Sequence, residues 1–194
     1  MKRSYLKVVI LLGLIINIIS CKAQTLPLNT LMENIPQNAH LKDLDNELSI
    51  YIGKYKADYQ GNEITIFITK EEDKFINYSD QQFYQDALII KYVIKNSSGV
   101  ILQDTQNMNF QPNQVKHNIY SIGTKPALGS IIFSYGGTNC GIGWGKIILK
   151  KLTATQISWD YRPNSSLIDS STCPPGTDKT VYLPVTKDLI FTKQ

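Results

Sequence analysis

The stretch Ile64-Thr65-Ile66-Phe67-Ile68-Thr69 decides the fold class, because its isoleucines recur at every second position. When apolar residues recur at every second position of a β-strand, they all lie on the same face, and the residues between them lie on the opposite face. We expect this strand to end at the charged run Glu71-Glu72-Asp73-Lys74. The same period recurs between Thr155 and Arg162, where Ile157, Trp159 and Tyr161 alternate with polar residues. Both stretches therefore predict strands with one apolar face.

Further strand candidates lie on both sides of these stretches and are separated by short runs of turn residues. They cover Ser49 to Tyr59, Ala87 to Lys95, Gly99 to Asp104, His117 to Ile122, Ser130 to Tyr135, Trp144 to Leu152, Thr180 to Leu183 and Asp188 to Thr192. This succession predicts an all-β, antiparallel domain. We favour an up-and-down β-barrel, since a closed barrel leaves no exposed edge strand, and keep a β-sandwich as the alternative.

The chain before the first strand is predicted to be organised differently. Two prolines interrupt the stretch 21–38, which therefore predicts a tether without long elements. Leucines recur at helical spacing in the next segment, so a short N-terminal helix is expected from His40 to Leu48. A single β domain is expected over residues 39–194, because the remaining length is that of one domain.

The N-terminus has the pattern of a lipoprotein signal. Met1 to Lys7 is basic without an acid, and the apolar run from Val8 to Ile19 is shorter than the roughly 20 residues of a transmembrane helix. The run closes on Ile18-Ile19-Ser20-Cys21, which resembles the bacterial lipobox. The resemblance implies that residues 1–20 are a cleaved signal peptide and that Cys21 is lipidated; an ordinary signal peptide with a chance cysteine is the alternative.

The residues after Cys21 bear on where the protein would be anchored. Lys22-Ala23-Gln24-Thr25 contains neither an Asp that indicates inner-membrane retention nor the acidic residues of a surface-export signal. The predicted location is therefore the cell envelope, on the outer membrane facing the periplasm. The attached lipid would be the contact with the membrane.

Charge and cysteine content narrow the partners and the compartment. The chain has 20 Lys and Arg against 16 Asp and Glu, but part of the basic excess lies in the predicted signal. The mature chain is then nearly neutral, which argues against a nucleic-acid-binding face. Cys140 and Cys173 remain in an oxidising compartment, so we predict a disulfide between them. A metal site or a thiol nucleophile is the competing interpretation, but the sequence places no His near either Cys and has no C-x-x-C.

Familiar catalytic and cofactor motifs are absent from the sequence. The segment Gly136 to Lys146 is rich in glycine but matches neither a phosphate-binding loop nor a dinucleotide fingerprint, and it predicts a tight loop into a strand. There is no H-E-x-x-H and no G-x-S-x-G. We therefore expect a protein that is not an enzyme, with no catalytic residue, metal ligand or cofactor. Because Asp and Glu are numerous, an envelope hydrolase with a carboxylate pair is the remaining enzyme alternative.

Two parts of the chain resemble known families. Tyr51-Ile52-Gly53-Lys54-Tyr55-Lys56 resembles the Gly-x-Trp start of lipocalin-type barrels, with Tyr55 in the place of the Trp. Cys140 to Lys146, together with Leu189 to Gln194, resembles small uncharacterised lipoproteins of Bacteroidota, known only as a domain of unknown function. The first resemblance implies a lipocalin-like barrel, whereas the second implies no activity.

Large aromatic residues in the predicted strands supply the candidate binding site. Rings that alternate inward in a barrel can line an apolar pocket, although they can equally fill a core that holds no ligand. The candidate ligand-binding residues are Tyr55, Tyr92, Phe133, Trp144, Trp159 and Tyr161. We therefore predict a lipid-anchored envelope protein that holds a small apolar or amphipathic ligand in a β-barrel. The alternative is a lipoprotein that binds or inhibits an envelope protein without catalysis.

Overall fold

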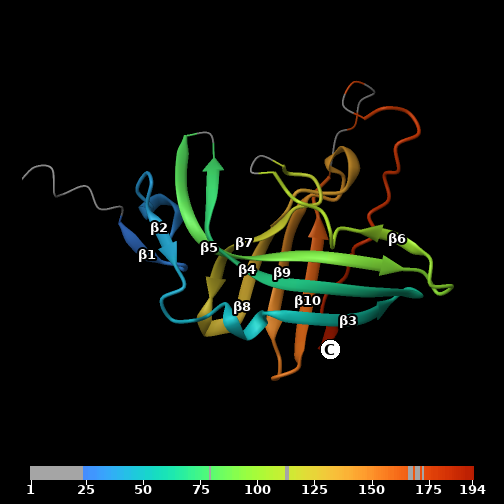
Figure 1. Ribbon diagram of the computed structural model, residues 1–194, viewed down its shortest axis with the longest axis horizontal. Coiled ribbons are helices and arrows are strands. Elements are labelled where there is room, and N and C mark those ends of the chain that lie inside the picture. The colour runs from blue at the N-terminus through green and yellow to red at the C-terminus, as the bar shows by residue number, and fades with distance from the viewer. Residues whose placement is uncertain (1–23, 79, 112–113, 166–167, 169–170, 172) are drawn as a thin grey trace, which may run out of the picture.

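The computed structural model describes residues 24–194 except 79, 112–113, 166–167, 169–170 and 172, and most of its strands close into one β-barrel (Figure 1). The barrel has eight strands, and each is antiparallel to its neighbours. They are β3 (Gly53–Tyr59), β4 (Asn62–Tyr78), β5 (Gln81–Lys95), β7 (Ile119–Lys125), β8 (Ser130–Tyr135), β9 (Gly145–Lys151), β10 (Gln156–Pro163) and β11 (Leu189–Lys193). Strand β11 pairs back with β3, and β5 meets β7 where Ile89 pairs with Tyr120. The predicted up-and-down barrel is confirmed, and the β-sandwich alternative is wrong.

The two alternating stretches place their apolar residues inside the barrel, as predicted. The inward residues are almost inaccessible, between 0% and 1% exposed: Ile64, Ile66 and Ile68 from β4, and Ile157, Trp159 and Tyr161 from β10. Strand β5 contributes Leu88, Ile90, Tyr92 and Ile94 in the same alternation, each 0% exposed. The barrel interior is therefore an apolar core built from every second residue of its strands.

Strand β4 does not end at the charged run Glu71 to Lys74, so that expectation is wrong. Glu71 pairs with Ala87 whereas Lys74 pairs with Gln85, and the register shift between the two pairs is a β-bulge. A bulge bends the strand that carries it and increases its twist. Beyond the bulge, residues 74–78 and 81–85 form an outer hairpin that projects away from the barrel (Figure 1).

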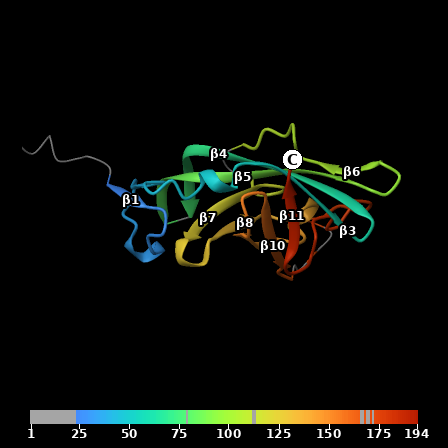
Figure 2. The ribbon, with the colours of Figure 1, turned by 90° about the horizontal axis from the view of Figure 1, so that it is seen from below.

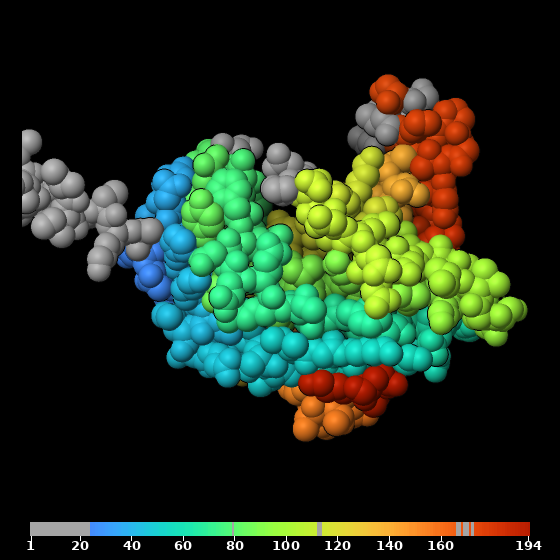
Figure 3. Space-filling view, viewed as in Figure 1, coloured from blue at the N-terminus to red at the C-terminus, as the bar shows by residue number. Residues whose placement is uncertain are grey.

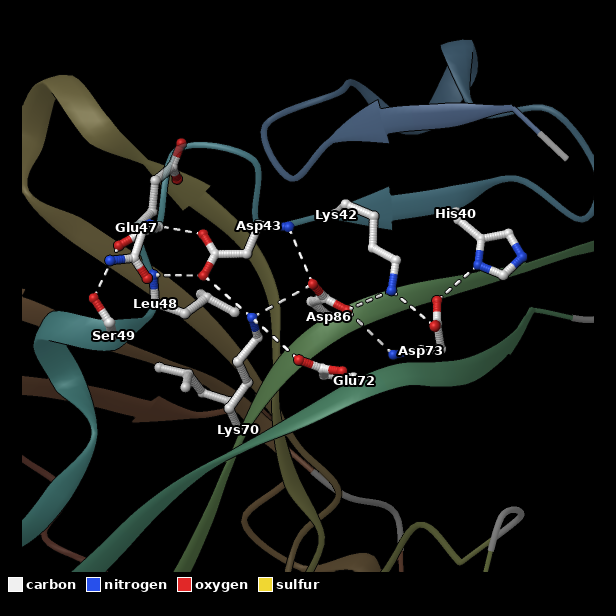
Figure 4. Close-up of polar contacts among 12 residues, drawn as sticks. His40, Lys42, Asp43, Glu47, Leu48, Ser49, Lys70, Glu72, Asp73 and Asp86 are labelled. Atoms are coloured by element: carbon white, nitrogen blue, oxygen red, sulfur yellow. Dashed lines mark hydrogen bonds and ion pairs between the residues drawn. The ribbon is translucent and has the colours of Figure 1, made fainter.

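Asp86 holds the bulge against the N-terminal part of the domain (Figure 4). Its carboxylate accepts hydrogen bonds from the backbone N–H groups of Asp43 and Asp73, each at 3.2 Å. The same carboxylate lies 3.1 Å from Lys42 Nζ and 3.5 Å from Lys70 Nζ. Burial alone would raise the pKa of Asp86, but these hydrogen bonds outweigh it, so its pKa lies below the ordinary value. The buried Asp86 carboxylate of β5 thus connects the bulge in β4 to the N-terminal segment.

The segment His40 to Leu48, predicted as a short helix, is not helical, so that prediction is wrong. Its first residues form β2 (His40–Lys42), which pairs parallel with β5. The Asp43 carboxylate then accepts hydrogen bonds from the backbone N–H of Glu47 at 2.6 Å and of Leu48 at 3.3 Å. Leu44 is exposed, so the leucines that suggested one helical face do not share one. Side-chain hydrogen bonds to the backbone offer the chain a turn in place of a helix.

The N-terminal residues that the structure describes lie beside the barrel (Figure 2). Within the stretch expected to be a tether, β1 (Thr25–Pro27) pairs parallel with β2, and Leu28 and Ile35 are buried. The predicted signal peptide, residues 1–20, and the predicted lipidation site Cys21 lie outside the described residues. In the part of the chain that is described, no helix has the length and apolarity needed to cross a membrane.

The remaining elements lie outside the eight barrel strands. Strand β6 (Ile101–Asp104) pairs with β5 but is not part of the closed barrel. The described residues also form four short 3-10 helices, which are η1 (Met32–Asn34), η2 (Ser49–Tyr51), η3 (Pro126–Leu128) and η4 (Asn139–Gly141). The predicted disulfide is confirmed, because Cys140 of η4 is bonded to Cys173 across 33 residues of sequence. Thr180 to Leu183, predicted as a strand, is not one, although the Leu183 side chain is buried.

Candidate functional site

Five of the six aromatic residues predicted to bind a ligand meet inside the barrel. Tyr55, Tyr92, Phe133, Trp159 and Tyr161 are each 0% exposed. The Trp159 ring lies 6.3 Å from that of Tyr161 and 5.6 Å from that of Phe191, measured between centroids. Because even a water-sized sphere reaches none of their surface, these five side chains pack as a core and border no open space.

The polar atoms of these rings are bound by the chain itself, except the Tyr55 hydroxyl, which is buried without a hydrogen-bond partner among the described residues. Trp159 Nε1 donates to the Pro184 carbonyl at 3.0 Å, and the Tyr161 hydroxyl donates to the Gly143 carbonyl. The Tyr92 hydroxyl donates to Gln103 Oε1 at 3.0 Å, and burial raises the pKa of Tyr92 to about 12. These contacts fix the rings in position and keep the phenols neutral.

Trp144 does not join the other five residues, so the expectation that it lies in a strand and faces inward is wrong. It immediately precedes β9, and its side chain is 48% exposed. Its indole N–H donates to the Ser165 carbonyl at 3.3 Å on the outside of the barrel. Strand β9 starts one residue later, at Gly145, and a side chain there would meet the Arg162 carbonyl at 2.8 Å.

The candidate site that the geometry favours lies outside the barrel, between the outer hairpin and the segments 105–111 and 114–118 (Figure 3). A hollow of about 390 Å³ opens there, lined by the apolar side chains of Phe75, Ile89, Met108 and Phe110. A second hollow of about 210 Å³ adjoins it and contains Ile76, Val115 and Tyr120 in its wall. The two share Lys74, Phe75 and Asn118, and we call them together the outer groove.

The walls of the outer groove are positioned by the bulge on one side and by backbone contacts on the other. Thr105 continues the pairing along β5, because its backbone N–H donates to the Tyr92 carbonyl at 2.8 Å. Phe110 then lies over Lys91 of β5, and residues 114–118 are held where Gly136 N–H donates to the Asn118 carbonyl at 3.1 Å. A Cβ atom at Gly136 would lie 1.9 Å from the Val115 carbonyl oxygen, so only glycine permits this approach.

Two lysines give the outer groove its charge. Lys74 Nζ lies 3.1 Å from Glu71 Oε2 and 5.7 Å from the centre of the Tyr120 ring. Lys91 Nζ lies 5.9 Å from the centre of the Phe110 ring, and no carboxylate of the described residues pairs with it. Lys74 is therefore neutralised locally, whereas Lys91 offers a positive charge to the groove.

Asn118 lies at the junction of the two hollows and carries an unsatisfied acceptor. The residue is 6% exposed, and its side-chain Nδ2 donates to the Gln114 carbonyl at 3.1 Å. Its Oδ1 atom has no hydrogen-bond partner among the residues that the structure describes. Since Nδ2 fixes which way the amide is turned, Oδ1 is an oriented acceptor without a donor.

Sequence reasoning missed every residue of the outer groove. Glu71 and Lys74 belong to the charged run that was expected to end a strand, and Asn118 lies in a predicted strand start. The one available signal was Met108-Asn109-Phe110, two large apolar residues in an otherwise polar segment. The groove joins segments far apart in sequence, so no motif spacing could have indicated it.

The described part of the chain offers no site of the metal-binding kind. No group of three or more His, Cys, Asp or Glu side chains among the described residues is placed to hold a metal ion. The densest charged cluster, around Asp86, pairs its carboxylates with Lys42, Lys70 and His40 instead (Figure 4). That cluster serves the bulge rather than the outer groove.

The whole chain matches a family model. The family is described as a family of unknown function, DUF6705, and the match covers residues 1–194. No curated protein and no solved structure matches the chain. The predicted resemblance to an uncharacterised family is confirmed at this level, whereas its lipoprotein nature and its Bacteroidota origin stay predictions. The chain therefore belongs to the DUF6705 family of unknown function.

Proposed function

We propose that this protein is a lipid-anchored binding protein of the cell envelope that holds a small amphipathic ligand and performs no catalysis. The lipobox-like residues Ile18-Ile19-Ser20-Cys21 support the lipid anchor, and the residues after Cys21 support an outer-membrane position facing the periplasm. The β-barrel is compatible with ligand binding, since barrels commonly present sites on a rigid frame.

The proposed binding site is the outer groove, not the barrel interior. The five interior rings border no open space, so a ligand there would have to displace a packed core. The outer groove is already open, and its larger hollow of about 390 Å³ combines four large apolar side chains with polar ones that include an available lysine. Pockets for small ligands typically range from about 300 to 1,000 Å³ and combine apolar walls with a few oriented polar groups.

The observation that carries the proposal is Asn118, which lines both hollows and whose buried Oδ1 has no hydrogen-bond partner among the described residues. A buried polar atom without a partner costs about 1–3 kcal/mol of stability. A ligand with a donor group that reached this oxygen would relieve that cost.

Methionine methyl resonances provide a direct test, because the chain holds only three methionines, at positions 1, 32 and 108. Met108 lines the outer groove, whereas Met32 lies on η1 and lines neither hollow. The full-length protein, labelled with ¹³C-methyl methionine, is titrated with a panel of small amphipathic molecules. Saturable shifts of the Met108 methyl with an unmoved Met32 methyl are expected.

A matched pair of variants controls this experiment. Thr69 is exposed on β4 and lines the larger hollow, so Thr69→Trp is expected to fill the groove and abolish the shifts. Thr192 is an exposed threonine of β11 outside the groove, and Thr192→Trp is expected to leave them unchanged. If no panel member moves Met108, or if both variants respond equally, the proposed function is wrong and a protein partner becomes the better candidate.

A further inference from the structure

We infer that the ligand of the outer groove is an amphipathic carboxylate that carries a hydrogen-bond donor beside the carboxylate, as in an N-acylated amino acid or the C-terminal end of a short peptide. This inference rests on the proposed function and specifies its ligand. It follows from three features of the groove, which are its unpaired cation, its unsatisfied acceptor and its apolar wall.

The cation is Lys91. The outward residues that flank it on β5, Ile89 and Val93, are only 7% and 8% exposed, because residues 105–111, residue 118 and β6 cover this face. Lys91 thus emerges from a largely covered surface, with an aromatic ring rather than a carboxylate as its described partner. An ammonium in such surroundings gains more from an anionic ligand than one in open water would. Lys74 is already paired with Glu71, so Lys91 leaves the outer groove with one positive charge that a singly charged anion would balance.

The acceptor is Asn118 Oδ1, which requires a hydrogen-bond donor on the ligand. A carboxylate alone has no donor, so it would satisfy Lys91 but leave Oδ1 unpaired. A fatty acid therefore meets one demand of the groove, and a neutral alcohol meets the other. A molecule with both a carboxylate and a nearby N–H or O–H meets both, and an amide N–H one bond from the α-carbon has that arrangement.

The apolar wall selects the remaining part of the ligand. Phe75 and Met108 are 39% and 36% exposed, which is unusual for large apolar side chains lining a hollow and leaves surface for a ligand to cover. Burial of apolar area provides the main favourable contribution to binding, whereas the two polar contacts orient the ligand. The volume of about 390 Å³ suits a molecule of one or two residues rather than a long lipid chain.

Matched ligands test the inference on the full-length protein through the Met108 methyl shift. N-acetyl-phenylalanine supplies the carboxylate, the donor and the apolar ring. Its methyl ester lacks the charge, its N-methyl derivative lacks the donor, and N-acetyl-glycine lacks the ring. Each of the three is expected to bind about tenfold more weakly than N-acetyl-phenylalanine, the effect of losing one hydrogen bond to a charged group or a buried ring.

Two lysine variants assign the charge. Lys91→Met is expected to abolish the preference for the acid over its ester, whereas Lys95→Met, on the same face of β5 and outside the groove, is expected to retain it. Equal binding of acid and ester by the unmodified protein, or a preference that survives Lys91→Met, overturns this inference and leaves the proposed function standing. If N-acetyl-phenylalanine and every other amphipathic molecule leave Met108 unmoved, the proposed function itself fails.

Discussion

Replacing Asp86 with asparagine is expected to lower the free energy of unfolding by about 3 kcal/mol. One carboxylate oxygen accepts from Asp73 N–H and faces Lys42, and the other accepts from Asp43 N–H and faces Lys70. An asparagine keeps only one acceptor oxygen. Its NH2 group must therefore face one of the two backbone N–H groups, which is left without an acceptor. That unsatisfied N–H costs about 1–3 kcal/mol, and each weakened lysine contact about 0.2–1 kcal/mol.

The same variant changes how stability depends on pH. The pKa of Asp86 is lowered from its ordinary value of 3.8, so its contribution is fully present above that value and is lost as the pH falls through the lowered folded value. The unmodified protein is therefore expected to lose stability in acid, and Asp86→Asn to show a smaller loss over the same range. Asp73, whose pKa is lowered by hydrogen bonds from Lys42 and His40, retains part of the effect in both proteins.

Urea unfolding at pH 7 and at a series of acidic values measures both effects. Asp160→Asn is the control, because the one ion pair of Asp160 among the described residues is with Arg162 at 3.8 Å, and its loss is expected to lower the free energy of unfolding by less than about 0.5 kcal/mol. Amide hydrogen exchange at Asp43 and Asp73 reports whether the bulge has loosened. An Asp86→Asn protein with the wild-type urea midpoint and the wild-type acid slope would refute the role assigned to this carboxylate.

The remaining predictions concern the disulfide, the anchor and the two tryptophans. Reducing the Cys140–Cys173 bond, which closes 33 residues, is expected to lower the free energy of unfolding by up to about 3.7 kcal/mol, measured by urea unfolding with and without reductant; an unchanged midpoint would contradict it. Cys21→Ser is expected to leave the protein unlipidated with its signal uncut, and an unmodified mature terminus in the wild-type intact mass would refute the anchor. Trp144→Phe is expected to remove the acrylamide-accessible fluorescence, because Trp144 is 48% exposed and Trp159 is 0% exposed; strong quenching of the remaining Trp159 would contradict the packed interior.

Much of the barrel could be predicted from local patterns. The period of two assigns an inward and an outward face to each strand, so the burial of Ile66 and Trp159 follows from their neighbours in the chain. The disulfide was predicted because the lipoprotein interpretation leaves two cysteines in a compartment predicted to be oxidising. The aromatic residues were correctly placed as a group because large apolar rings in alternation must face the core, and the exception, Trp144, lies outside the strand.

The helix that was expected near the N-terminus failed for a reason that local spacing could not supply. Leucine spacing favours a helix only if nothing competes for the backbone N–H groups. Here the Asp43 side chain takes two of them, and β2 finds a parallel partner in β5, more than 40 residues away in the chain. Tertiary pairing therefore overrode the local pattern.

The sequence by itself determined that the chain is all-β, which face of the alternating strands β4 and β10 enters the core, and which two cysteines pair. Only the tertiary structure decided that β4 bends at a bulge, that residues 105–111 lie over the outer face of β5, and that Lys91 and Asn118 share a groove. The physical reason is that burial alternates along a strand and is visible in a few residues, whereas the bulge depends on Asp86 receiving backbone N–H groups from Asp43 and Asp73. Contacts between segments distant in the chain leave no periodic pattern in the sequence, because they form only when the folded barrel brings those segments together.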